Sequence, residues 1–185
     1  MENKILFINA CVREGSRTLE LANCLLDKLN GEVTRVELYN ENILPLDGKG
    51  LEKRDTKDYS LDEFKYAQQF KDADVIVVAA PFWDLSFPSV VKIYFENITI
   101  SGLTFEYSSK GRPVGKCNAK KLYYVTTAGG YIANNNFGYD YVKALATNFF
   151  GIEKTHFYSA EGLDIFGADT QKILSDAKAK ISNEI

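Results

Sequence analysis

The sequence of 185 residues lacks the features that mark membrane proteins, secreted scaffolds and metal-binding modules. Its longest apolar run covers residues 75–83, well short of the roughly 20 residues that a membrane-spanning helix needs. Three cysteines, Cys11, Cys24 and Cys117, form no Cys-x-x-Cys pair, which excludes a disulfide scaffold or a structural zinc module as the leading interpretation. Because the start of the chain has no basic region followed by a cleavage site, we expect no targeting segment and a cytoplasmic location.

An excess of charge of one sign is also missing. The chain has 22 basic and 25 acidic residues, a net charge of −3 and no basic stripe. Nucleic acid and anionic membranes both attract such a stripe, so we expect neither as a partner. Aromatic rings, in contrast, are abundant, with 12 Phe, 11 Tyr and one Trp. These are more rings than a minimal core requires, and their positions along the chain are therefore informative.

Short apolar runs alternate with helical patterns along the whole chain. The runs predict strands at residues 4–9, 33–38, 75–80, 121–127 and 155–160. Apolar residues at helical spacing predict helices over residues 18–30, 62–71, 87–99, 137–150 and 169–181. Residues 40–60 and 101–119 are polar and contain glycine, and we expect them to form surface connections. No repeat or linker interrupts the pattern, and a single domain over residues 1–185 is predicted.

This alternation predicts an α/β fold built on a doubly wound, five-stranded parallel sheet with helices on both faces. Such folds bind ligands outside the carboxyl ends of the strands, at the point where the strand order reverses. The loops that follow the first, third and fourth predicted strands are therefore the candidate functional segments.

The loop after the first strand, residues 10–18, has the composition of an anion site. Ser16 and Thr18 supply hydroxyls at the start of a predicted helix, whose free N–H groups favour a phosphate, and Arg13 and Arg17 add positive charge. The alternative is that Ser16 or Thr18 is only the N-cap of the helix and that the arginines are solvated. The glycine patterns of Rossmann dinucleotide sites and of P-loops are absent.

The loop after the third strand carries four large apolar side chains, Phe82, Trp83, Leu85 and Phe87. They are suited to bury a flat heteroaromatic ring, although they could instead cap the core. After the fourth strand, Gly129 and Gly130 allow the backbone to approach a ligand closely, or serve only a turn. A phosphate cradle, an apolar ring slot and a hydrogen-bonding glycine loop at one sheet edge together fit flavin mononucleotide, FMN.

At these residues the chain resembles the flavodoxin-like NAD(P)H:quinone reductases and FMN-dependent NADH-azoreductases. Ser16-Arg17-Thr18 is similar to the phosphate loop of that family, and residues 80–85 are similar to its isoalloxazine loop, A-P-x-[YW]-[NQ]-[FW]. Residues 103–107, the glycine loop at 126–130, and residues 150–152 with 159–162 also match family segments in order and spacing. The resemblance covers nearly the whole chain and implies a flavodoxin-like domain with strand order 2-1-3-4-5.

The resemblance implies noncovalent FMN and a set of residues that hold it. Ser16, Arg17 and Thr18 would contact the phosphate; Pro81, Phe82, Trp83, Asp84 and Leu85 would hold the ring; and Thr126, Thr127, Ala128, Gly129, Gly130 and Tyr131 would hold its other edge. Family members are homodimers, and Phe105 and Phe149 match positions where the partner subunit covers the flavin face on the substrate side. The aromatic-faced helix predicted over residues 87–99 also suggests an interface. No catalytic side chain and no metal are predicted, because the flavin carries the hydride chemistry.

The implied activity is transfer of two electrons, by a ping-pong mechanism, from NAD(P)H to quinones, azo compounds or nitro compounds. The alternatives are a flavodoxin-type electron carrier, an NAD(P)H-dependent FMN reductase, and a family member that has lost catalysis. No arginine cluster marks a site for the 2′-phosphate that distinguishes NADPH from NADH.

The chain departs from the family pattern at a few positions. Asp84 stands where the family has Asn or Gln, so contact through the Asp84 backbone N–H is predicted. Arg17 occupies a variable position, which makes its backbone N–H the expected ligand. Cys11 is interpreted as a small buried hydrophobe and the single histidine, His156, as structural.

Overall fold

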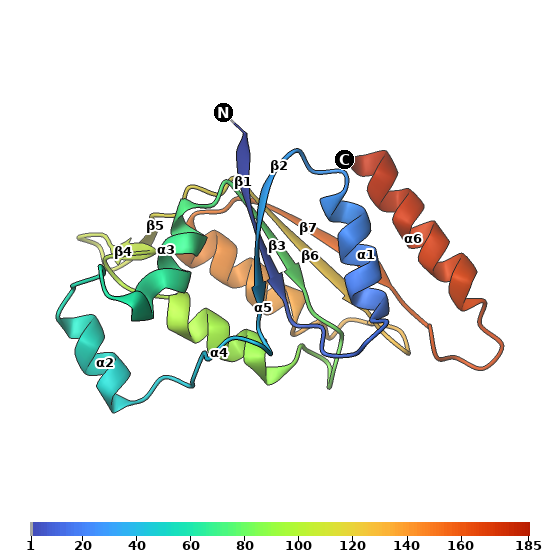
Figure 1. Ribbon diagram of the computed structural model, residues 1–185, viewed down its shortest axis with the longest axis horizontal. Coiled ribbons are helices and arrows are strands. Elements are labelled where there is room, and N and C mark those ends of the chain that lie inside the picture. The colour runs from blue at the N-terminus through green and yellow to red at the C-terminus, as the bar shows by residue number, and fades with distance from the viewer. Residues whose placement is uncertain (1) are drawn as a thin grey trace.

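The computed structural model describes residues 2–185 and contains a five-stranded parallel sheet in the order β2-β1-β3-β6-β7 (Figure 1). The strands are β1 (Asn3–Asn9), β2 (Gly31–Glu37), β3 (Val75–Ala79), β6 (Lys121–Thr127) and β7 (Lys154–Ala160). Numbered among themselves, they have the order 2-1-3-4-5, which confirms the predicted doubly wound, flavodoxin-like topology. The order reverses between β1 and β3, so their carboxyl ends form the edge where ligands bind in such folds.

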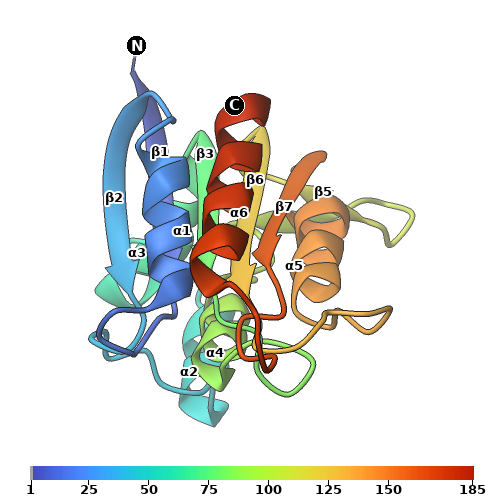
Figure 2. The same cartoon turned by 90° about the vertical axis from the view of Figure 1, so that its right-hand side faces the viewer.

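Helices cover both faces of the sheet, since alternate strand residues point to opposite sides. On one face lie α1 (Arg17–Leu26) and α6 (Thr170–Glu184), which Figure 2 shows side by side. On the other lie α3 (Lys65–Asp72), α4 (Ser89–Ile98) and α5 (Tyr139–Leu145). The first face buries Ile5, Phe7, Val77, Tyr123 and Val125, and the second buries Leu6, Ile8, Val78, Leu122 and Tyr124. Burial on both faces explains why these strands are nearly continuous apolar runs.

The two predicted connections contain secondary structure that their composition did not reveal. Residues 40–60 include the helix α2 (Gly48–Asp55), which has no buried residue and therefore lacks the apolar stripe of a sequence-predictable helix. Residues 101–119 include an antiparallel hairpin, β4 (Phe105–Tyr107) and β5 (Pro113–Gly115). Each hairpin strand is only three residues long, too short for a period-two pattern to emerge.

Other helix boundaries differ in detail from the prediction. The 3₁₀ turn η1 (Asp62–Phe64) leads into α3, and α5 continues as a π-helix, η2 (Ala146–Phe150). The π-helix ends at Gly151, which has φ = 76°. This left-handed conformation is the one that glycine adopts readily at a helix end.

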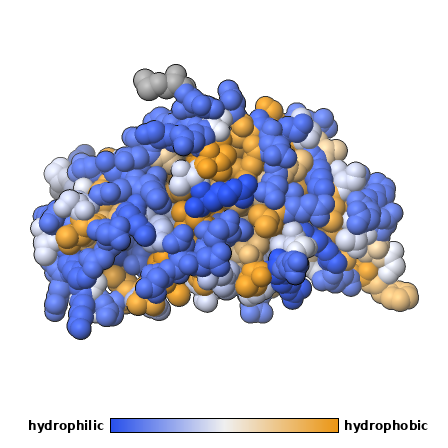
Figure 3. Space-filling model, viewed as in Figure 1, coloured by the Kyte–Doolittle hydropathy of each residue, from blue (hydrophilic) through white to orange (hydrophobic). Residues whose placement is uncertain are grey.

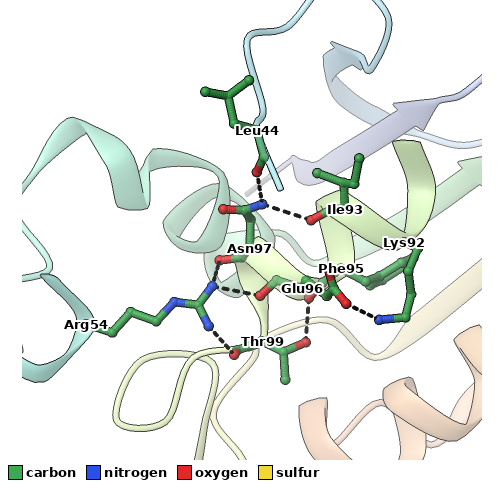
Figure 4. A network of polar contacts seen from close by, with 8 residues as sticks. All are labelled: Leu44, Arg54, Lys92, Ile93, Phe95, Glu96, Asn97 and Thr99. Carbon is green, nitrogen blue, oxygen red and sulfur yellow. Dashed lines mark hydrogen bonds and ion pairs between the residues drawn. The ribbon is translucent and has the colours of Figure 1, made fainter. Parts of the chain in front are cut away.

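Polar contacts attach α2 to the body of the molecule (Figure 4). The Arg54 guanidinium donates hydrogen bonds to the carbonyl oxygens of Glu96 and Asn97 at the C-terminus of α4, with N···O distances of 2.7 and 3.2 Å. The Asn97 side-chain amide donates in turn to the carbonyl of Leu44, at 2.9 Å. Hydrogen bonds to the end of α4 thus help to hold the segment that contains α2, together with Ile43 and Tyr59, which pack against the core on either side of it.

The surface is predominantly polar on the face seen in Figure 3, with hydrophobic residues scattered between hydrophilic ones. Within residues 2–185, no helix combines the length and apolar character that crossing a membrane requires. All three cysteines are free thiols.

Candidate functional site

A cleft of about 480 Å³ opens at the carboxyl ends of β1, β3 and β6, where the three candidate loops meet. Its lining comes from four segments: Cys11 to Thr18, Pro81 to Trp83, Thr127 to Gly129, and Leu163 with Asp164. A larger hollow of about 690 Å³ lies along residues 40–66 and is lined by many charged side chains. We assign the site to the strand-end cleft because the three candidate loops, with their hydroxyls, free N–H groups and aromatic rings, meet there at the sheet edge where doubly wound folds bind ligands.

The start of α1 forms one end of the cleft. Ser16 is the N-cap and accepts a hydrogen bond from the backbone N–H of Leu19, at 3.3 Å, so the capping role considered from the sequence is confirmed. Within residues 2–185, the backbone N–H groups of Arg17 and Thr18 have no acceptor. Gly15 has φ = 66°, and a Cβ added to it would meet no atom within 4 Å, so the loop is open to solvent. The capped helix therefore still presents free donors to an anion.

Two contacts tie this loop to the glycine loop across the cleft. The hydroxyls of Thr18 and Thr127 are 2.6 Å apart and share a hydrogen bond. The Phe82 N–H donates to the carbonyl of Thr127, at 3.1 Å, and so joins the aromatic loop to the same strand end. The three loops are thereby held as one unit.

The aromatic loop turns sharply after Trp83. Trp83 and Ser86 exchange two backbone hydrogen bonds, of 3.0 and 2.7 Å, around Asp84 and Leu85, which have φ values of 50° and 65°. Positive φ at both central residues is the pattern of a type I′ turn, normally filled by Asn and Gly, and it strains a leucine. The turn leaves 38% of Trp83 and 51% of Leu85 exposed, so these two side chains do not cap the core.

The glycine loop is paired with the chain that leaves β7. The N–H groups of Gly162, Leu163 and Asp164 donate to the carbonyls of Gly130, Ala128 and Gly129, at 2.8, 3.2 and 3.0 Å respectively. The Asp164 side chain lies directly over Gly129, because a Cβ on that glycine would be 2.5 Å from Asp164 Oδ2. A side chain at Gly129 would therefore displace the Asp164 carboxylate, whereas a Cβ at Gly130 would meet nothing within 4 Å.

Most of the residues predicted to hold a cofactor line the cleft. They are Ser16, Arg17, Thr18, Pro81, Phe82, Trp83, Thr127, Ala128 and Gly129. Asp84, Leu85, Gly130 and Tyr131 belong to the same loops but lie outside the lining. Thr126 is buried, and its hydroxyl has no hydrogen-bond partner among residues 2–185. Its side chain points to the same face of the sheet as that of Tyr124, which is the face opposite to Thr127. A contact between the Thr126 side chain and a ligand in the cleft is not supported.

The two residues predicted on the substrate side, Phe105 and Phe149, lie outside the cleft of their own chain. Their ring centroids are 4.9 Å apart, where the β4–β5 hairpin packs on η2, and Phe105 is only 5% exposed. Within one chain, then, Phe105 is a core residue of the hairpin. Contact with a substrate bound to another subunit stays a prediction.

Cys11 lines the cleft and is half-buried, although its interpretation from the sequence was a buried hydrophobe. Burial raises the pKa of the Cys11 thiol to about 11, a shift that a hydrogen bond with Ser16 partly opposes. The thiol is protonated at neutral pH and is therefore not a nucleophile. His156 lies away from the cleft, stacked on Tyr123 with ring centroids 4.8 Å apart, as a structural role requires.

Sequence reasoning missed Leu163 and Asp164. Only the loops after the first, third and fourth strands were considered, yet β7 is paired directly with β6 and ends at the same sheet edge. Applying the strand-end rule to the fifth strand would have included them. The signal was present in the predicted strand order.

Comparison with known proteins identifies the family. A family model described as flavodoxin-like fold matches residues 3–185. The chain belongs to this family. It is 35% identical to an FMN-dependent NADH:quinone oxidoreductase of Clostridium beijerinckii and 33% identical to one of Clostridium perfringens, over 96% of both chains in each case.

Solved structures agree with the fold. An azoreductase from Bacillus anthracis superposes with a TM-score of 0.86 over 98% of this chain and 97% of that one, at 24% identity. An FMN-dependent NADH-azoreductase from Bacillus anthracis in complex with FMN gives 0.81 over 98% and 96%, also at 24% identity. At these identities the structural likeness supports the flavodoxin-like fold alone.

Proposed function

We propose that the protein is an FMN-dependent NADH oxidoreductase that passes two electrons to quinones, and also to azo or nitro compounds, from a flavin-binding domain over residues 1–185. The observation that carries this proposal is the convergence of free helix N–H groups, an aromatic turn and a glycine loop on one cleft. The relatives that match along nearly the whole chain bear the name FMN-dependent NADH:quinone oxidoreductase, which supports the same activity.

The residues present fit FMN. A cleft of about 480 Å³ falls within the range of about 300–1,000 Å³ that is usual for ligands of this size. At one end, the N–H groups of Arg17 and Thr18 and the Ser16 hydroxyl supply donors for a phosphate. At the other end, Pro81, Phe82 and Trp83 supply an apolar wall for the ring.

In this proposal the residues of the chain bind and orient the cofactor. FMN, when bound, would supply the hydride chemistry between NADH and the acceptor. The N–H groups of Asp84 and Leu85 have no acceptor within residues 2–185, so they are free to meet a polar ring edge that extends past the cleft lining. The Thr18–Thr127 hydrogen bond joins the phosphate end to the glycine loop, and the bond from the Phe82 N–H to the Thr127 carbonyl joins that loop to the ring end.

We also propose a homodimer, on evidence that differs from the sequence argument. The aromatic face of α4 does not support it, because Tyr94 and Phe95 are fully buried in their own chain. Large apolar side chains are exposed instead on the cleft loops and on the hairpin: Tyr131, Phe137 and Phe166, and Tyr107 and Val114. Exposed apolar groups of this size are typical of interfaces.

We place the protein in the cytoplasm because its cysteines are free thiols.

The proposal is tested first by flavin binding. Protein mixed with FMN and desalted should keep visible flavin absorbance, whereas Ser16→Asp should lose it, because a carboxylate would meet the phosphate. Asp is a good N-cap, so this variant should fold, as circular dichroism can verify. Lys172→Ala, on an exposed pair of α6, is the matched control and should stay yellow. A folded Ser16→Asp protein as yellow as the wild type would contradict the assignment of the phosphate end.

Turnover then separates the alternatives. The FMN-loaded protein should oxidise NADH steadily when benzoquinone is added. A flavodoxin-type carrier would bind FMN without such turnover, and an FMN reductase would need free FMN in excess over protein. Sedimentation of the active protein should give twice the chain mass of 20.8 kDa.

A further inference from the structure

Arg17 and Asp164 form an ion pair across the mouth of the cleft. Arg17 Nη1 and Asp164 Oδ1 are 2.8 Å apart, and both residues line the cleft together with Ser16 and Gly129. The pair joins the first residue of α1 to the loop after β7, 147 positions away in the sequence. It is partly exposed, with 41% and 70% of the two side chains accessible to solvent.

The carboxylate is held in place by backbone, not only by the arginine. The Asp164 N–H donates to the Gly129 carbonyl, and the two preceding residues make the same kind of bond to the glycine loop. The absence of a Cβ at Gly129 gives the Asp164 side chain its position over the loop. Asp164 therefore belongs to the wall of the cleft, and its negative charge stays at the phosphate end.

The charges at this end cancel. Arg13 and Arg17 are balanced by Glu14 and Asp164 among the lining residues. A phosphate that enters beside the N-terminus of α1 meets an arginine that already has a carboxylate partner. Anions that share one guanidinium repel each other, so each weakens the other's binding.

We propose that Asp164 competes with the FMN phosphate for Arg17, and so lowers the affinity for FMN and makes the cofactor exchangeable. This inference rests on the proposed function, since it assumes that FMN occupies the cleft. Asp164 is a positioning residue in this scheme: it holds the Arg17 side chain across the mouth of the cleft until the phosphate takes its place.

The test compares two flavins that differ only in the phosphate. Asp164→Asn keeps the size and the backbone bonds of the residue but removes the charge, and it should tighten FMN binding by roughly three- to tenfold. Binding of riboflavin, which has no phosphate, should stay unchanged. Both affinities are measured by quenching of flavin fluorescence. FMN binding should also become more sensitive to salt in the variant, because a new ion pair forms without one being lost.

Two variants complete the design. Asp176→Asn makes the same charge change at an exposed pair with Lys172 on α6, and should leave both affinities unchanged. Asp164→Glu keeps the charge and should retain the wild-type ratio of FMN to riboflavin affinity. Weaker FMN binding by Asp164→Asn, or an equal change for both flavins, would overturn the competition. A wild-type protein that binds neither flavin would instead overturn the proposed function.

Discussion

The N-terminus of α1 and the C-terminus of α4 handle the same physical problem in opposite ways. Every helix end leaves up to four backbone groups without intrahelical partners. At the end of α4, all of the last four carbonyls are satisfied: Phe95 by Thr99, Glu96 and Asn97 by Arg54, and Ile98 by the Thr104 hydroxyl. At the start of α1, the N–H groups of Arg17 and Thr18 remain free within residues 2–185.

This difference separates a structural end of the molecule from a binding end. Arg54 of α2 bonds carbonyls at the end of α4 (Figure 4), and the Thr104 hydroxyl, next to the hairpin, bonds the carbonyl of Ile98. The cleft end instead keeps free donors, exposed aromatic rings and a turn with two residues at positive φ. Strain and unsatisfied groups persist where a ligand can use them.

The largest difference in stability is expected between substitutions at two glycines, one in the hairpin and one in the glycine loop. A Cβ at Gly115, in the hairpin, would lie 2.1 Å from the carbonyl carbon of Phe150 and 2.2 Å from the Gly151 nitrogen. Because backbone atoms cannot yield cheaply, Gly115→Ala should lower the free energy of unfolding by about 3 kcal/mol. Gly130→Ala, in the glycine loop, should change it by less than about 0.5 kcal/mol. Urea denaturation of both variants measures this, and equal losses would remove the contrast.

A smaller effect is expected at Arg54. Arg54→Met keeps most of the aliphatic stem but leaves the carbonyls of Glu96 and Asn97 without their donor, and should cost about 1–2 kcal/mol of unfolding free energy. Lys53→Met is the neighbouring control, since Lys53 makes only an exposed pair with Glu63, worth about 0–1 kcal/mol. FMN affinity should not change in either variant. A loss no larger for Arg54→Met than for Lys53→Met would contradict the capping role.

The same contrast explains what could be predicted from the sequence. The buried strands, such as 75–80, were predictable because burial on both faces demands an uninterrupted apolar run. The loops that follow them were predictable as a site because parallel strands bring their carboxyl ends together. The α2 helix was not, because it buries no residue and is attached by Arg54 and other polar contacts, which leave no periodic apolar signal.

The sequence patterns also did not predict which side chains at the site point into the cleft. Thr126 and Thr127 are adjacent and chemically identical, yet only Thr127 lines the cleft, because strand alternation turns Thr126 to the other face. Gly129 was predicted to let the backbone approach a ligand closely, and the structure adds that the Asp164 side chain lies over this glycine. That contact joins residues far apart in the chain, so no local pattern could reveal it.

The smallest predicted effect concerns His156, which lies away from the cleft and has a ring nitrogen without a hydrogen-bond partner among residues 2–185. This nitrogen, Nε2, is buried. Burial, together with Lys121 and Lys154, lowers the pKa of His156 below its ordinary value of 6.5, and Glu184 only partly opposes this. In the unfolded chain the imidazole takes up a proton near pH 6.5, whereas the folded protein resists protonation until a lower pH.

The lower pKa of His156 in the folded state determines how the free energy of unfolding changes with pH. Below pH 6.5 the unfolded state binds more protons than the folded state, so the free energy of unfolding falls as the pH drops through that window and is fully recovered above it. His156→Phe keeps the stack on Tyr123 and removes the titration. The stability difference between wild type and variant should therefore be flat above about pH 7 and should move in favour of the variant between about pH 6.5 and 5. Urea denaturation across this range measures it, and a difference that favours the wild type increasingly as the pH falls would mean that a partner stabilises the charged imidazole.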